Sequence, residues 1–254
     1  MAVLILFLAI VATLFGAPPA RAQTTLHVAA AADLQPVMPA LAAEYEKKTG
    51  VKIETSYGSS ATLTTQILNG APMDLFLAAD FTFPEKVVAA NLADTRSPTV
   101  YAKGTLVLWA RKDSPLQPLS MDRLTDPRVT RIAVANAEHA PYGRAAISAL
   151  HWLRLYDKVA PHLVIAENIA QTAQFVESGN AQLGLISLTV ASTQHFRNLG
   201  TYVLVPTYAY PQIRQCAVVM TKSPHKAEAH AFLNWLLTPA VQNQLHTFGL
   251  TPVQ

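Results

Sequence analysis

The stretch VKIETSYGSSATLTTQILNGAPMDLFLAAD, residues 51–80, predicts a strand, a polar corner, a helix and a second strand. Apolar residues alternate over 51–55, recur at helical spacing over 63–68 and form a continuous run at 75–77. The Asn-Gly pair at 69–70 ends the helix. Together these features indicate a βαβ unit, and the rest of the chain can be arranged around it.

The corner of this unit places Ser59, Ser60 and Thr62 where the helix begins. A helix N-terminus carries unpaired N–H groups and the positive end of the peptide dipole, so it is suited to bind an anion. Serine before a helix is also the commonest N-cap, which needs no ligand. Both interpretations stay open from these residues alone.

Length and composition indicate a globular protein with a sizeable core. The chain has 254 residues, of which 51% are hydrophobic and 14% charged, with a formal net charge of +3. Length alone allows one or two domains. Its basic pairs, Lys47-Lys48 and Arg111-Lys112, are isolated, so we expect no nucleic-acid partner.

The N-terminus resembles an export signal. Residues 1–22 contain a short apolar run, a Gly/Pro break and the sequence Ala20-Arg21-Ala22, a cleavage site of the secretory type. We expect cleavage before Gln23 and a periplasmic location. No Lys or Arg precedes the apolar run, so an uncleaved anchor is the alternative.

The single cysteine, Cys216, cannot form an internal disulfide and is predicted to be a small buried residue in a strand. An exported protein without bridges must be held together by its core. That is ordinary for a two-domain bacterial periplasmic protein. No cysteine lies near the cleavage site, which argues against a lipid anchor.

A second strand-to-helix corner precedes the first unit. Residues 26–30 read as a strand, and a helix with an apolar face ends at Gly50. Between them lie the small residues Ala31 and Ala32, and then Asp33, which we expect to cap the following helix with its carboxylate. This corner and the Ser60 corner point the same way from one parallel sheet, at the edge where open α/β sheets bind ligands.

The βα pattern repeats between about residues 105 and 205, which predicts a second α/β lobe of parallel strands joined by helices. Residues 213–220 then form a strand and 227–237 a helix, and both most simply return to the first lobe. This arrangement gives two crossings, near 103 and near 209, with a cleft between the lobes. The predicted division is 1–22 signal peptide, 23–103 and 210–254 lobe I, and 104–209 lobe II.

Six segments carry a resemblance to a known family. They are AAADL at 30–34, YGSSATLTTQI at 57–67, NGAPMDLFLAAD at 69–80, NAEHAPYGRAA at 136–146, ENIAQTAQFVESGNAQLGLIS at 167–187 and FLNWL near 232–236. Over nearly the whole mature chain the sequence resembles the periplasmic molybdate-binding proteins of ABC transporters. The resemblance implies a type II periplasmic binding protein with two α/β lobes, two hinge crossings and an interlobe cleft.

The resemblance also implies a function and a set of site residues. A member of this family captures molybdate, and by expectation tungstate, in the cleft and delivers it to a membrane permease. It works as a monomer, without a cofactor and without protein ligands to a metal cation. The positions that match the family's oxyanion site are Ala32, Asp33, Ser60, Tyr142 and Ile169, the last by its backbone N–H, with Ser187 less closely matched.

Asp33 departs from the family pattern, in which many relatives have Ser or Asn at this position. A carboxylate that faces a dianion would repel it, so we expect the side chain to cap its own helix and the backbone N–H to face the ligand. An acidic edge could instead favour a protonated oxyanion, since a carboxylate accepts the ligand's proton. A site for sulfate or phosphate is therefore the alternative.

An enzyme is the more distant alternative. The corner YGSSA lacks the second glycine of a G-x-S-x-G motif, and no histidine is identified as a partner for a Ser60 nucleophile. The eight histidines meet no metal-ligand spacing. His139, three residues before Tyr142, is the one histidine that could line the cleft.

Overall fold

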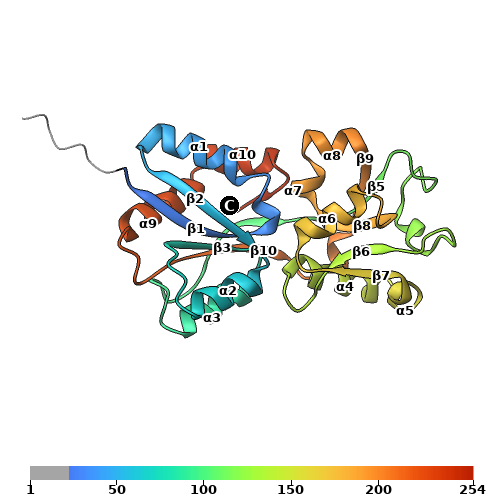
Figure 1. The fold of residues 1–254 in the computed structure, drawn as a ribbon, viewed down its shortest axis with the longest axis horizontal. Helices are drawn as coiled ribbons and strands as arrows, with labels where there is room; N and C mark the ends of the chain where they lie inside the picture. The colour runs from blue at the N-terminus through green and yellow to red at the C-terminus, as the bar shows by residue number, and fades with distance from the viewer. Residues whose placement is uncertain (1–22, 254) are drawn as a thin grey trace, which may run out of the picture.

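The computed structural model describes residues 23–253 and consists of two α/β lobes, each built on one mixed sheet (Figure 1). The first sheet has the order β11-β4-β10-β3-β1-β2 and the second has the order β7-β6-β8-β5-β9. The predicted fold class, a two-lobe α/β protein, is confirmed. The predicted signal peptide, residues 1–22, lies outside the described residues.

Lobe I combines both ends of the described chain. Its strands are β1 (Thr25–Ala31), β2 (Lys52–Gly58), β3 (Leu75–Ala78), β4 (Thr99–Gly104), β10 (Ile213–Val219) and β11 (Thr251–Pro252). Its helices are η1 (Ala32–Leu34), α1 (Met38–Thr49), α2 (Ser60–Leu68), α3 (Thr82–Ala89), α9 (Lys226–Leu236) and α10 (Pro239–Thr247).

Lobe II is the middle of the chain. Its strands are β5 (Leu106–Arg111), β6 (Ile132–Ala135), β7 (Leu163–Ala166), β8 (Leu183–Ser187) and β9 (Gly200–Leu204). Its helices are η2 (Met121–Thr125), α4 (Pro141–Trp152), α5 (Tyr156–Val159), η3 (Ala160–His162), α6 (Ile169–Glu177), α7 (Leu188–Ala191), α8 (Gln194–Leu199) and η4 (Thr207–Ala209).

Both faces of the lobe I sheet are covered by helices. Alternate residues of β1 enter different cores: Val28 packs with α1, α9 and α10, whereas Ala29 packs with α2 and α3. Figure 1 shows α1 and α10 on one side of the strands and α2 and α3 on the other. This burial on two faces explains why β3, and β1 from Val28 onward, are continuous apolar runs.

The first helix begins later than expected. The sequence predicts a helix from Asp33, but the structure has only a short 3₁₀ turn there, and α1 begins at Met38. Pro39 lies in the first turn of α1, where its missing N–H costs no hydrogen bond. A helix that began at Asp33 would place this proline in its interior.

Lobe II is not wholly parallel, so the prediction of parallel strands is wrong for one of them. Strand β6 runs parallel to β7 and β8, but β5 runs antiparallel to β8 and β9. The chain enters this lobe at the cleft, so β5 must run away from the cleft. Strands β6, β7 and β8 run toward it and end there.

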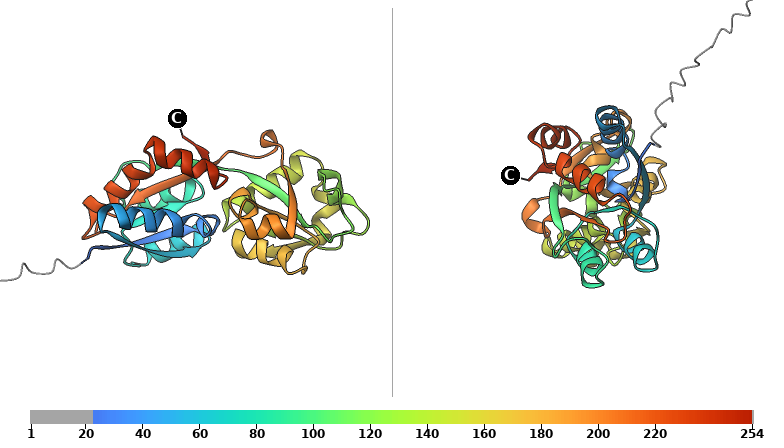
Figure 2. Two further views of the ribbon diagram at one scale, coloured as in Figure 1. Left: turned by 90° about the horizontal axis from the view of Figure 1, so that it is seen from above. Right: turned by 90° about the vertical axis from the view of Figure 1, so that its left-hand side faces the viewer.

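Two crossings join the lobes, as the sequence predicts (Figure 2). Strand β4 ends at Gly104 in the first sheet and β5 begins at Leu106 in the second, while residues 205–212 make the return. The Leu106 N–H donates to the Tyr210 hydroxyl at 3.2 Å, which ties one crossing to the other. The exact boundaries at 103/104 and 209/210 stay predictions.

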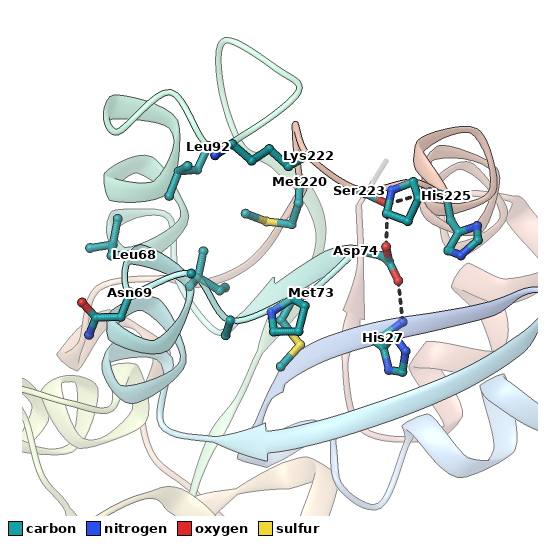
Figure 3. Close-up of a pocket in the computed structure, with 15 residues that line it drawn as sticks. His27, Leu68, Asn69, Met73, Asp74, Leu92, Met220, Lys222, Ser223 and His225 are labelled. Atoms are coloured by element: carbon teal, nitrogen blue, oxygen red, sulfur yellow. Dashed lines mark hydrogen bonds between the residues drawn. The ribbon is translucent and has the colours of Figure 1, made fainter.

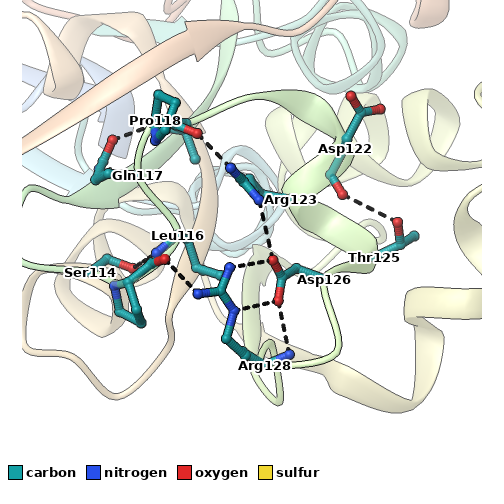
Figure 4. A network of polar contacts seen from close by, with 11 residues as sticks. Ser114, Leu116, Gln117, Pro118, Asp122, Arg123, Thr125, Asp126 and Arg128 are labelled. Carbon is teal, nitrogen blue, oxygen red and sulfur yellow. Dashed lines mark hydrogen bonds and ion pairs between the residues drawn. The ribbon is translucent and has the colours of Figure 1, made fainter.

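A polar network holds the end of lobe II that lies far from the hinge (Figure 4). The Arg128 guanidinium donates to both carboxylate oxygens of Asp126, at 2.8 and 2.6 Å, and Arg123 adds a longer contact. The hydrogen bonds from Arg128 lower the pKa of Asp126 well below its ordinary value. Its side chains pair with one another. We therefore interpret this network as stabilising the 112–131 connection and not as a ligand site.

Candidate functional site

A small cavity lies between the lobes, where β1, β2, β6 and β7 end and the helices that follow them begin. The volume open to the centre of a water-sized sphere is ≈ 10 Å³. A cavity needs about that much to hold one water, so this closed conformation has no room for a sugar or an amino acid. Its lining consists of Ala31, Ala32, Asp33, Gly58, Ser59, Ser60, Ala79, Ala140, Pro141, Tyr142, Asn168 and Ile169.

The two serines at the α2 corner have different tasks. Ser59 is the N-cap, and its side chain accepts from the Thr62 N–H at 3.1 Å. Ser60 is the first helical residue, and its Oγ accepts from the Ala79 N–H at 3.2 Å. Because that bond occupies an oxygen lone pair, the Ser60 hydroxyl hydrogen is free to donate to a ligand.

Tyr142 brings a second hydroxyl from lobe II. The residue is 1% exposed, and within residues 23–253 its hydroxyl has no hydrogen-bond partner. A Cβ on Gly104 would lie 2.2 Å from this oxygen, so the close approach of α4 to the hinge strand requires glycine there. A buried phenol with no partner is expected where its hydroxyl donates to a bound ligand.

Backbone N–H groups of helix starts complete the donors. Ile169 is the first residue of α6, whose N-cap is Asn168, and Ala32 begins η1. The first N–H groups of a helix have no intrahelical acceptor, and in α2 and α6 the dipole adds a partial positive charge. Ala32, Asp33, Ser60, Tyr142 and Ile169, the five residues predicted with most weight, all line the cavity.

The Asp33 side chain does not cap its helix, so that prediction is wrong. The residue that precedes η1 is Ala31, and no side chain caps this turn. Instead Asp33 Oδ2 accepts from Gln215 Nε2 of β10, and Oδ1 is among the buried oxygens that have no partner in the described chain. Because Asp33 is 0% exposed, burial raises the pKa of its carboxyl to about 7.

The cavity offers hydrogen-bond donors without a countercharge. Among the described residues that line it, none is Lys or Arg. The nearby Arg144 is paired with Asp80 at 2.9 Å. An anion here would be held by hydroxyls, backbone N–H groups and helix dipoles.

The lobes are closed on each other around this cavity. The Ala61 N–H donates to the His139 carbonyl at 3.1 Å, and Thr62 Oγ1 donates to Glu167 Oε1 at 3.1 Å. On the other side Thr189 Oγ1 donates to the Asp33 carbonyl at 2.7 Å. A ligand in the cavity would therefore be enclosed by both lobes.

Comparison with known proteins identifies the family of this chain. Residues 26–251 match the family described as bacterial extracellular solute-binding protein. The chain belongs to this family. The molybdate-binding protein ModA of Azotobacter vinelandii is 36% identical over 224 residues, which cover 88% of each chain. ModA of Rhodobacter capsulatus is 32% identical, over 91% of this chain and 89% of the relative.

A solved structure agrees. The periplasmic molybdate-binding protein of Azotobacter vinelandii superposes with a TM-score of 0.85 and 32% identity, over 90% of this chain and 100% of that one. The resemblance to molybdate-binding proteins is thereby confirmed, as is the two-lobe type II fold. The family consists of solute-binding proteins and not of enzymes, which excludes the hydrolase alternative.

Two residues of this solute-binding protein lie elsewhere than expected. Ser187 does not line the cavity: its hydroxyl contacts Thr189 Oγ1 at 2.8 Å and accepts from the Val190 N–H, as the N-cap of α7. The His139 ring also lies outside the lining and contacts Glu167 at 3.2 Å. Of the lining residues, Asn168 was predicted to begin a helix but not to belong to the site.

A larger cavity of ≈ 660 Å³ lies at the opposite edge of the lobe I sheet (Figure 3). Its lining includes His27, near the start of β1, and Asp74, just before β3. The Asp74 carboxylate accepts from the His27 N–H at 2.7 Å and from the Ser223 hydroxyl. The Asp74 carboxylate is thus already paired within the protein, in contrast to Asp33 Oδ1 and the Tyr142 hydroxyl between the lobes.

The residues 23–253 contain no helix long and apolar enough to cross a membrane. In that part of the chain no three His, Cys, Asp or Glu side chains form a group that could hold a metal ion.

Proposed function

We propose that this protein binds molybdate, and with it tungstate, in the interlobe cavity and delivers it to the permease of an ABC importer. The convergence of neutral donors from four helix starts on one small cavity carries the proposal. Molybdate is a tetrahedral dianion near neutral pH, so it needs donors on several sides. The relatives that match this chain over most of its length are named for molybdate binding.

The proposed ligand contacts are the Ser60 and Tyr142 hydroxyls and the backbone N–H groups of Ala32, Asp33 and Ile169. Lobe closure excludes water from the cavity, and the closed form presents both lobes to the permease at once. We further propose that residues 1–22 are a cleaved signal, that the mature protein begins at Gln23 in the periplasm, and that it acts as a monomer.

Calorimetric titration of the protein that begins at Gln23 tests this function. Molybdate and tungstate are expected to bind one to one, with sulfate and phosphate orders of magnitude weaker. If only sulfate or phosphate gave heat, the ligand would be that oxyanion and not molybdate. Absence of heat with all four oxyanions would contradict the proposal.

Tyr142→Phe tests the site within the same titration. Its hydroxyl has no partner in the described chain, so its removal breaks no internal hydrogen bond. A hydrogen bond to a charged group contributes about 1.5–3 kcal/mol, which corresponds to roughly 10- to 150-fold in the molybdate Kd. Tyr156→Phe, at the ring stacked on His151, is the matched control and should keep native affinity. Equal affinities of the two variants would remove Tyr142 from the site.

A further inference from the structure

Asp33 is the one ionisable carboxyl among the residues that line the cavity, and only one of its two oxygens has a hydrogen-bond partner. Oδ2 accepts a hydrogen bond from Gln215 Nε2. Oδ1 has no partner within residues 23–253, although the residue is 0% exposed and lines the cavity. A buried polar atom without a partner costs free energy, so its persistence at a ligand site calls for an explanation.

No positive charge offsets this carboxyl. Tyr142 and Tyr101 are the titratable groups closest to it, and burial raises the pKa of both phenols well above the ordinary value, so both are neutral. The other elements packed against η1 are β2, α6 and α7. In β2, Lys52 pairs with Glu54 at 2.7 Å.

The remaining groups on these elements are also neutral or directed elsewhere. Tyr57 follows in β2, Glu177 at the far end of α6 contacts His195 at 2.6 Å, and α7 has no titratable residue. Beside Gln215 in β10, Arg214 lies over the Phe81 ring and the Cys216 thiol is held neutral by burial, which raises its pKa to about 12. A carboxylate at Asp33 would therefore face a bound dianion with nothing to screen it.

We propose that Asp33 is a ligand-binding residue of this site in its neutral form, and that Oδ1–H donates a hydrogen bond to one oxyanion oxygen. This inference rests on the proposed function. It replaces a repulsive carboxylate with one more donor, and it couples each bound dianion to one proton. The proton is taken from solvent by Asp33, and no bond of the oxyanion forms or breaks.

The burial of Asp33 makes this proton easy to supply near neutral pH. The pKa of the Asp33 carboxyl is about 7 in the free protein, so roughly half of the molecules already carry this proton at pH 7. Above that pH the proton must be taken up with the ligand, so the molybdate Kd should rise about tenfold for each pH unit. Asn at this position would supply its amide N–H at every pH while its carbonyl accepts from Gln215.

The test is titration of the mature protein and of Asp33→Asn with molybdate between pH 6 and pH 9. Each titration is repeated in two buffers of different ionisation enthalpy, which reports the protons taken up. The native Kd is expected to rise about 50-fold from pH 7 to pH 9, with uptake close to one proton at the upper end. Asp33→Asn should show a flat Kd and no uptake. Glu85→Gln, on the exposed face of α3 and outside the lining, should keep the native slope.

A native Kd independent of pH, without proton uptake, would overturn the inference and leave molybdate binding in place. A pH slope retained in Asp33→Asn would assign the proton to another group. Absence of molybdate binding at every pH would contradict the proposed function instead. The native uptake measurement decides the question even if the variant does not fold.

Discussion

Asp33 differs from the other residues of the cavity because its environment works against its charge. Burial raises the pKa of this carboxyl to about 7, while the hydrogen bond from Gln215 and the nearby Tyr142 hydroxyl act in the opposite direction. In the closed geometry neither Asp33 Oδ1 nor the Tyr142 hydroxyl reaches a full hydrogen bond within the described chain. The free protein therefore carries unsatisfied groups at its site, and a ligand with several acceptor oxygens would satisfy them.

Asp33 should make the ligand-free protein less stable as the pH rises. Its folded pKa is raised, so the folded state holds the proton more tightly, and the free energy of unfolding falls between pH 3.8 and about 7. The full effect is roughly 4 kcal/mol, of which about 2–3 kcal/mol falls between pH 5 and pH 8. Urea unfolding measures the free energy of unfolding of the native protein and of Asp33→Asn at these two pH values. From pH 5 to pH 8 the variant should become more stable relative to the native protein by that amount. A constant difference would mean that Asp33 is charged throughout.

At the scale of elements, the start of α2 serves two purposes. Ser60 turns its hydroxyl to the cavity, while Thr62 reaches across the cleft to Glu167 of lobe II. Burial raises the pKa of Glu167, but hydrogen bonds from His139, Thr62 and Ser59 outweigh this effect and leave it below the ordinary value. The same helix thus contacts the ligand and holds the closed form.

Thr62→Val should speed ligand release. The substitution keeps the side-chain shape and removes two hydrogen bonds, one accepted from Ser59 within lobe I and one donated to Glu167 across the cleft. The bond across the cleft contributes about 0.5–1.5 kcal/mol, so molybdate should dissociate roughly 2- to 12-fold faster in stopped-flow displacement. Thr65→Val is the control on the same helix, since the Thr65 hydroxyl donates to the Ala61 carbonyl within α2. Equal rates for the two variants would show that the Glu167 contact does not hold the cleft closed.

At the scale of the whole molecule, the site exists only when both lobes meet. Ser60 comes from lobe I, and Tyr142 and Ile169 come from lobe II. A ligand bound between them links two bodies that are otherwise joined by two crossings and by contacts at the cleft edge. Ligand binding and lobe closure are therefore one equilibrium.

Hydrogen exchange should report this linkage. Molybdate is expected to slow exchange at the start of α2 in lobe I and at the start of α6 in lobe II together, because the ligand stabilises the closed form as a unit. Helix α9, on the far side of lobe I, should change little. Mass spectrometry measures the exchange of peptides from these three helices with and without molybdate. Protection in one lobe alone would contradict a site between the lobes.

The sequence by itself determined the local parts of this protein. Apolar periodicity and helix-end signals located the βα corners at Asp33 and Ser60. The resemblance to the family named Ala32, Asp33, Ser60, Tyr142 and Ile169 as site residues, and the structure brings these five together. The tertiary structure decided how the side chains at those corners are used. Asp33 turns to Gln215, which lies 182 residues away, and β5 pairs with β8 and β9 in the opposite direction because the chain enters lobe II at the cleft. Such pairings depend on contacts between distant segments, and short-range patterns in a sequence carry no record of them.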